Sequence, residues 1–121
     1  MADRESIMVP TDGPVKLIIT RRFIDNLTKV LRYSLENFGG KVMLEFLGEI
    51  NKGLLKLPFF PDVNPLNPFL ESTEQKTYRN IIFKKYPYVI LYSVEQKSVT
   101  VFNIIHSKRN PKYRKETIFV N

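Results

Sequence analysis

The sequence contains no cysteine and a single histidine, His106. Without cysteine the chain can form no disulfide, no thiolate zinc site and no cysteine nucleophile, and one histidine excludes a metal site built from several histidines. Carboxylates are also scarce at the C-terminal end, where only Glu95 and Glu116 follow Glu74. We therefore expect neither metal-dependent nor carboxylate-based nuclease chemistry, no metal site and no cofactor.

Long apolar runs are missing as well. No stretch approaches the roughly 18 apolar residues that span a bilayer. The first ten residues carry mixed charge and lack the apolar segment of a secretory signal. These absences predict a cytoplasmic protein that does not associate with membranes.

The length and composition are those of one globular domain. A chain of 121 residues, 43% of them hydrophobic, can bury a single core and is too short for two. Residues 1–14 are polar, contain Pro10, Gly13 and Pro14, and show no periodicity, so we expect a flexible leader. Residues 15–121 are expected to form the domain and to end in a basic tail.

A helical hairpin is predicted after a first strand at Val15–Ile19. Apolar residues recur every three or four positions through residues 20–57, with one interruption near residue 40, as in two amphipathic helices. Thr20 can cap the first helix, and Gly39 can supply the left-handed residue that ends it. Pro58 stops the second helix because it lacks an amide hydrogen.

Four of the eight prolines lie within residues 58–68, which predicts that residues 58–75 form a loop. This loop is unusually apolar. We expect it to lie on the core, because its large side chains are too apolar for free solvent: Phe59, Phe60, Leu66, Phe69 and Leu70.

Three strands are predicted in the last third, at Tyr78–Lys85, Tyr88–Val94 and Ser98–His106, because these segments are rich in β-branched and aromatic residues. The short joints between them predict an antiparallel meander. Asn110–Pro111 resembles a helix start, which predicts one helical turn over Lys112–Thr117. The fold class is therefore α+β, with one small sheet packed on two helices.

The positive charge is confined to one part of the chain. Residues 1–75 hold nine basic and ten acidic residues, whereas residues 76–121 hold ten basic and two acidic ones. A basic surface favours a polyanion or an acidic protein as partner. The candidate nucleic-acid or target-binding residues are Arg79, Lys84, Lys85, Lys108, Arg109, Lys112 and Arg114.

Aromatic residues are interleaved with these cations. Bases of single-stranded RNA stack on such rings while Lys and Arg neutralise phosphates. The alternative is that the rings are strand residues chosen for packing and that the lysines keep a sheet edge soluble. The residues concerned are Tyr78, Tyr86, Tyr88, Tyr92 and Tyr113.

The densest basic segment is residues 106–115, where His106 marks the transition from strand to tail. A neutral imidazole there can act as a general base or as a structural hydrogen-bonding group. If the protein cuts RNA, it does so without metal, with Arg or Lys stabilising the phosphate and the RNA 2′-hydroxyl attacking.

The order of elements resembles that of the RelE/ParE toxins of bacterial toxin–antitoxin modules. The resemblance rests on the proline-bearing joint within Lys85–Tyr92 and on the strand ending Ile104–Pro111, and it covers about residues 15–115. It implies a toxin that is neutralised by a cognate antitoxin, and we expect this antitoxin to be acidic. The resemblance includes the plasmid stabilisation proteins of this family. The antitoxin is expected to wrap the helical hairpin and can add to a sheet edge.

The resemblance implies two alternative mechanisms. In the ParE-like one, which we favour, the protein traps DNA gyrase through surface contacts that include Arg109 and the tail. In the RelE-like one it is a metal-independent, ribosome-dependent mRNA endoribonuclease. Arg109 then stabilises the transition state and Tyr113 or His106 moves a proton, while Lys84 or Arg79 holds a phosphate. A degenerate toxin retained for repression with its antitoxin is a third alternative.

Overall fold

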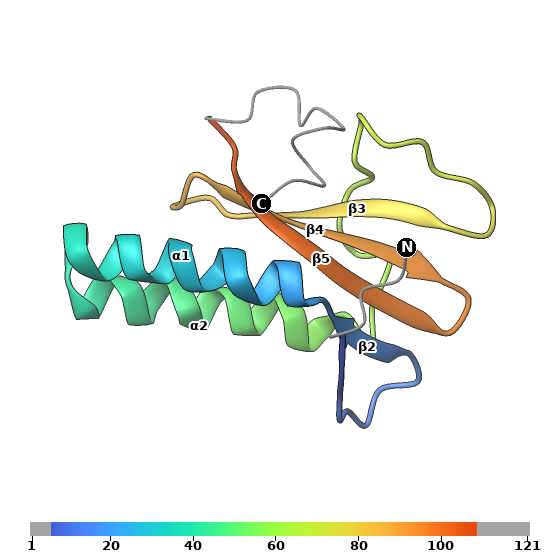
Figure 1. Cartoon of the computed structure of the whole chain (residues 1–121). Coiled ribbons are helices and arrows are strands. Elements are labelled where there is room, and N and C mark those ends of the chain that lie inside the picture. The colour runs from blue at the N-terminus through green and yellow to red at the C-terminus, as the bar shows by residue number, and fades with distance from the viewer. Residues whose placement is uncertain (1–5, 109–121) are drawn as a thin grey trace.

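Two helices cover one face of a five-stranded sheet in the computed structural model, which describes residues 6–108 (Figure 1). The predicted α+β class and the helical hairpin are confirmed. In chain order the elements are β1 (Ile7–Val9), β2 (Lys16–Ile19), α1 (Arg21–Phe38), α2 (Gly40–Lys56), β3 (Thr77–Ile82), β4 (Tyr88–Glu95) and β5 (Ser98–His106).

The predicted boundaries of the hairpin are also confirmed. The Thr20 hydroxyl accepts a hydrogen bond from the Phe23 amide at 3.1 Å and so caps α1. Gly39 has a φ of 88° and separates the two helices, which a residue with a side chain could do only under strain. The second helix ends at Lys56, just before Pro58.

The sheet is larger than predicted. Strands β3, β4 and β5 form the expected antiparallel meander, and β2 adds to β5 in parallel, with Leu17 opposite Val99. Strand β1 then pairs with β2, so the order is β1-β2-β5-β4-β3. Part of the segment expected as a flexible leader is therefore a strand, because Ile7–Val9 gains hydrogen bonds from the edge of β2.

A β-bulge interrupts the pairing of β4 with β5. Leu91 lies opposite Asn103 and Tyr92 opposite Val101, which leaves Phe102 as the extra residue. The carbonyl of Phe102 accepts a hydrogen bond from the Thr20 hydroxyl at 3.2 Å. The capping residue of α1 is thereby joined to the middle of the sheet.

The main core lies between the hairpin and the sheet, and a smaller apolar cluster lies on the other face. The fully buried residues of the main core come from every layer: Leu17, Phe23, Phe46, Ile50, Leu57, Ile90, Tyr92, Val99 and Val101. The smaller cluster consists of Leu70, Val89, Leu91, Phe102 and Ile105.

The loop after α2 does not bury its apolar side chains as predicted. Of the five residues expected to lie on the core only Leu70 is buried, whereas Phe59, Phe60, Leu66 and Phe69 are 49%, 63%, 50% and 39% exposed. The loop contacts the sheet through polar groups instead. At Leu66 the loop backbone pairs with the edge of β3, whereas Phe59 and Phe60 lie in the turn that follows α2.

Two buried asparagines make that contact. The side-chain amide of Asn67 donates to Asn80 at 2.9 Å, and the Asn67 backbone amide donates to the Tyr78 carbonyl at 2.7 Å. The Asn80 amide donates to the Pro65 carbonyl at 3.0 Å. These bonds satisfy groups that an open sheet edge would leave unpaired.

Gly13 is expected to tolerate no side chain, whereas Gly48 should. A Cβ on Gly13 would lie 2.4 Å from Pro58 Cβ and 2.8 Å from its carbonyl carbon, while a Cβ on Gly48 would meet nothing within 4 Å. We expect Gly13→Ala to lower the free energy of unfolding by about 1–3 kcal/mol. Gly48→Ala should raise it by about 0.5–1 kcal/mol, because alanine favours the helix. Urea unfolding measures both, and a Gly13→Ala variant as stable as the parent would contradict the packing.

Candidate functional site

Basic side chains gather at the end of the sheet where β3 turns into β4. Tyr88 pairs with His106, and the Ser107 amide donates to the Pro87 carbonyl at 2.8 Å, so the β3–β4 turn lies beside the end of β5. Strand β3 ends at Ile82, and not at residue 85 as predicted. The predicted residues Lys84, Lys85 and Lys108 are therefore brought to one end of the sheet, and all three are exposed.

A groove of about 300 Å³ separates this end of the sheet from the tip of the helical hairpin. Its walls come from the end of α1, the start of α2 and the β3–β4 turn. The lining residues are mostly aromatic or aliphatic: Tyr33, Ser34, Phe38, Val42, Phe46, Lys85, Tyr86, Pro87, Tyr88 and His106. The groove therefore has an apolar lining with cations at its rim, which suits an apolar side chain of an acidic partner.

Phe46 of α2 forms the floor of the groove. Its ring stacks on Tyr86 and Tyr88 with centroids 4.4 and 5.4 Å apart, and it meets Phe83 edge to face at 5.4 Å. Two of the tyrosines predicted to stack on bases thus stack on a core phenylalanine. This favours the packing interpretation for Tyr86 and Tyr88.

His106, at the end of β5, is one of the residues that line the groove. Its ring meets Tyr88 edge to face at 5.1 Å, and its Nδ1 accepts a hydrogen bond from the Lys108 amide at 3.2 Å. Among the described residues that line the groove, none is Asp or Glu. The side chains of the groove that could move a proton are therefore His106, Lys85 and the tyrosines.

Four predicted site residues lie outside the described residues 6–108. They are Arg109, Lys112, Tyr113 and Arg114, and the predicted helical turn over residues 112–117 lies there too. Their predicted roles in target binding or catalysis stay predictions. Lys108 is the last residue that the structure describes.

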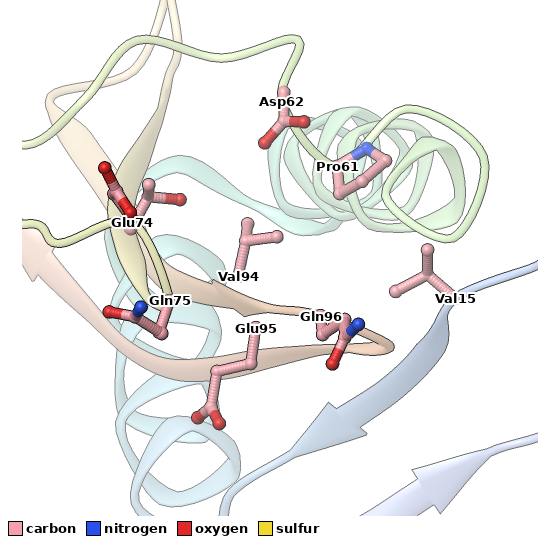
Figure 2. Close-up of a pocket in the computed structure, with 9 residues that line it drawn as sticks. Val15, Pro61, Asp62, Glu74, Gln75, Val94, Glu95 and Gln96 are labelled. Atoms are coloured by element: carbon pink, nitrogen blue, oxygen red, sulfur yellow. The ribbon is translucent and has the colours of Figure 1, made fainter.

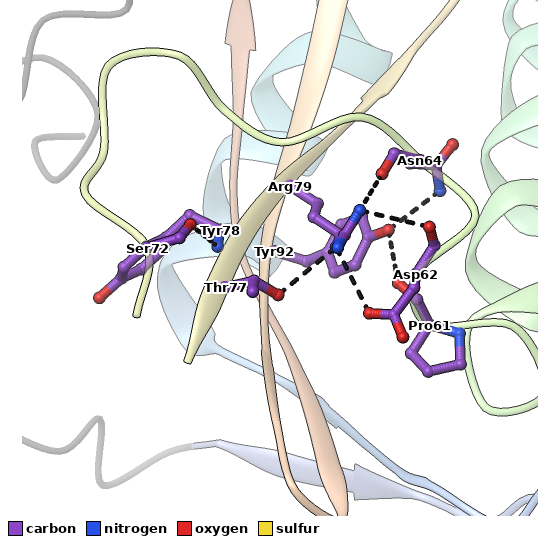
Figure 3. Close-up of polar contacts among 8 residues, drawn as sticks. All are labelled: Pro61, Asp62, Asn64, Ser72, Thr77, Tyr78, Arg79 and Tyr92. Carbon is purple, nitrogen blue, oxygen red and sulfur yellow. Dashed lines mark hydrogen bonds and ion pairs between the residues drawn. The ribbon is translucent and has the colours of Figure 1, made fainter. Parts of the chain in front are cut away.

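Arg79 is not part of this basic end, because it holds the loop after α2 (Figure 3). Its Nη1 donates to the carbonyls of Asn64 at 2.7 Å and Asp62 at 3.2 Å. Its Nε donates to the Thr77 hydroxyl at 3.4 Å and lies 3.5 Å from the Asp62 carboxylate. With a side chain only 17% exposed, Arg79 offers little surface to a partner, and its predicted phosphate contact stays a prediction.

Tyr92 lies beneath this loop and is fully buried, so it cannot stack on a base as the tyrosine pattern suggested. Its hydroxyl donates to the Pro61 carbonyl at 2.9 Å and accepts from the Asn64 side-chain amide at 3.1 Å. Burial raises the pKa of Tyr92 above its usual value of 10.0, although the bond from Asn64 and the charge of Arg79 act in the opposite direction.

The raised pKa of Tyr92 predicts a pH dependence of stability. Because the folded protein favours the neutral phenol, the contribution of this hydroxyl is fully present below pH 10 and is lost as the pH rises through the folded-state pKa. Tyr92→Phe should be less stable than the parent by about 1 kcal/mol at neutral pH. The difference should shrink above pH 10. Urea unfolding of both proteins at neutral and alkaline pH tests this, and a constant difference would contradict it.

A larger pocket of about 660 Å³ lies at the opposite end of the sheet, between the loop and the β4–β5 turn (Figure 2). Carboxylates of Asp62, Glu74 and Glu95 line it. Glu95 lies 3.6 Å from the Lys76 ammonium, and Asp62 is paired with Arg79. Within residues 6–108 no group of three or more His, Cys, Asp or Glu side chains is placed to hold a metal ion.

Comparisons with known proteins identify the family. Residues 17–111 match the family described as "ParE toxin of type II toxin-antitoxin system, parDE". The chain belongs to the ParE toxin family. The predicted resemblance is thus confirmed. The family match begins after β1 and ends at residue 111, so it includes the groove and the basic end of this ParE-family chain, and leaves out Lys112, Tyr113 and Arg114.

The fold of this ParE-family chain is similar to that of a solved protein described as "Chromosomal ParDE TA system from P. aeruginosa". The two are 15% identical, and the match has a TM-score of 0.57 and covers 73% of this chain and 90% of the other. No curated protein sequence matches the chain. Neither α1 nor α2, the helices within the described residues, is long and apolar enough to cross a membrane.

Proposed function

We propose that this ParE-family toxin inhibits DNA gyrase through protein–protein contacts and is neutralised by a cognate antitoxin. The observation that carries the proposal is the family match over residues 17–111, which spans the helical hairpin, the meander and the basic end of the sheet. The groove gives it further support, because a mostly apolar lining suits contact with another protein.

The helical hairpin is the surface that we assign to the antitoxin. Its tip exposes large apolar side chains next to the groove: Tyr33 is 42%, Leu35 49%, Phe38 62% and Leu44 62% exposed. Exposed apolar patches of this kind mark sites of protein binding. The nearby Lys84, Lys85 and Lys108 favour an acidic partner, because opposite charges attract the partner and set its orientation.

Two assays test the function together. Purified protein is added to a gyrase supercoiling reaction, in which we expect inhibition with stabilised cleaved DNA. It is also added to a coupled translation reaction, in which we expect intact mRNA. Codon-linked mRNA cuts with unaffected gyrase would replace the proposal with the RelE-like endoribonuclease, and no effect in either reaction would indicate a degenerate toxin.

Arg109→Ala is expected to relieve the growth arrest that follows induced expression. Arg109 follows Lys108 in the sequence, and we expect its guanidinium to contact the target. Colony counts after induction measure the effect, and Lys97→Ala, in the β4–β5 turn at the other end of the sheet, is the matched control. Full toxicity of the Arg109→Ala protein would remove Arg109 from the site.

A further inference from the structure

The loop after α2 exposes large apolar side chains that neither the core nor the groove uses. Phe59, Phe60, Val63, Leu66 and Phe69 are 49%, 63%, 62%, 50% and 39% exposed. We call these five residues the loop surface. A run of apolar side chains left exposed on one segment is uncommon in a monomeric protein and marks an interaction site.

The loop surface is held in place before any partner arrives. The Phe60 amide donates to the Lys56 carbonyl at 2.8 Å, and the Val63 amide donates to the Phe60 carbonyl at 3.3 Å, which fixes the turn after α2. Arg79 and the buried Asn67 hold the rest of the loop on β3. A segment that is already ordered loses little conformational entropy on binding, so its apolar contacts contribute more fully to affinity.

The charge of the loop differs in sign from that of the chain. Residues 57–75 contain Asp62, Glu71 and Glu74 and no Lys or Arg, although the whole chain has a net charge of +7. Carboxylates repel phosphates, so this surface does not suit DNA or RNA. They also repel an acidic antitoxin. The chemistry that fits is an apolar protein patch bordered by basic residues.

We propose that the loop surface binds the protein target of the toxin, and that the target offers an apolar patch with basic residues around it. Under the function proposed above, on which this inference rests, that target is DNA gyrase. The loop surface belongs to the opposite end of the molecule from the hairpin tip, since it follows the C-terminal end of α2 (Figure 1). The loop surface is therefore separate from the hairpin surface that we assign to the antitoxin.

The test compares a loop variant with a hairpin variant. The loop variant carries Phe60→Ser and Val63→Ser, and the matched control carries Leu44→Ser on α2, because all three side chains are 62–63% exposed. Each protein is assayed for growth arrest on induction, for gyrase inhibition, and for binding to the adjacent protein, by which we mean the small antitoxin that we expect the neighbouring reading frame to encode. Thermal unfolding and size-exclusion chromatography show whether each variant is folded and whether the parent is monomeric.

We expect the loop variant to be folded, to bind the adjacent protein with unchanged affinity, and to lose toxicity, with its inhibition of gyrase weakened roughly tenfold or more. Leu44→Ser should keep toxicity and bind the adjacent protein more weakly. Growth arrest by the loop variant equal to that of the parent overturns the inference. So does weakened binding of the adjacent protein, or a parent dimer that the loop variant dissociates.

The same experiment separates this inference from the proposed function. If the parent arrests growth without inhibiting gyrase, the gyrase proposal is wrong. The inference about the loop surface is then tested by growth arrest alone, and a folded loop variant that still arrests growth overturns that inference. If the loop variant has lost growth arrest and still binds the adjacent protein, the loop surface is retained as the contact with another protein target.

Discussion

Phe46→Ala is expected to lower the free energy of unfolding by about 3–5 kcal/mol, since removal of a buried aromatic ring loses its burial and leaves a cavity. Phe46 is 1% exposed and contacts three aromatic rings of the β3–β4 turn and β4. The free energy of unfolding of a small domain is only about 5–15 kcal/mol, so this substitution would remove a large part of it. Urea unfolding followed by circular dichroism measures the loss.

Removal of the Phe46 ring should also change the shape of the groove, because this ring lines it. Without the ring, Tyr86 and Tyr88 lose the ring on which they stack, and the β3–β4 turn that carries Lys85 is less firmly packed on α2. Leu44→Ala, on the same helix but at a residue 62% exposed, is the control and should change stability by less than about 0.5 kcal/mol. A loss at Phe46 no larger than that of the control would mean that the neighbouring rings close the gap.

Arg79→Ala is expected to lower the free energy of unfolding by about 2–3 kcal/mol, the cost of losing charge-assisted hydrogen bonds from a mostly buried side chain. The guanidinium bonds the carbonyls of Asp62 and Asn64, and so holds the loop over the Tyr92 hydroxyl. Its removal should also expose the loop to proteases. Limited proteolysis should then cut within residues 58–75 before the rest of the domain.

The Asp62→Asn variant distinguishes the contribution of the ion pair to stability from that of the hydrogen bonds between Arg79 and the loop carbonyls. The Asp62 side chain is 70% exposed and lies 3.5 Å from Nε, so its charge should contribute no more than about 1 kcal/mol. Lys84→Ala, at an exposed residue of the β3–β4 turn, should have almost no effect on stability. If Asp62→Asn were as damaging as Arg79→Ala, the carboxylate rather than the two carbonyls would be the principal partner.

The helical hairpin could be predicted from the sequence because its signals are local. A period of three to four residues, a Thr at the start, a Gly at the turn and a Pro after the end each act within one or two turns of chain. Thr20, Gly39 and Pro58 therefore have the roles expected of them. The meander was predictable for the same reason, since its strands are joined by short turns.

Contacts between distant segments were not predictable in this way. Ile7–Val9 has no alternation of its own and becomes a strand only because β2 offers an edge. The contact of α2 with β3 at Gly53 also depends on the tertiary fold, since a Cβ there would lie 3.3 Å from the Ile81 side chain. The sequence predicted that the apolar loop after α2 would bury its side chains. It could not show that the loop backbone pairs with β3 at Leu66, which is a contact between distant segments.

The candidate site was predictable in part. The pattern of cations placed Lys84, Lys85 and Lys108 in one group, and the structure brings these three to one end of the sheet, beside the catalytic candidate His106. The pattern of cations also included Arg79. The contacts of Arg79 depend on the conformation of the loop after α2, which cannot be predicted from the composition. The apolar groove beside the cations was not predicted, because its walls come from segments about fifty residues apart in the chain.

The extra residue of β5 decides which way His106 faces. Before the bulge, Val99 and Val101 point to the helices, and after it Ile104 does so, because one added residue exchanges odd for even positions. His106 shares the parity of Ile104 and therefore lines the groove under the hairpin. A regular strand of the same residues, without the bulge at Phe102, would present Ser107 to the groove, with His106 on the opposite face.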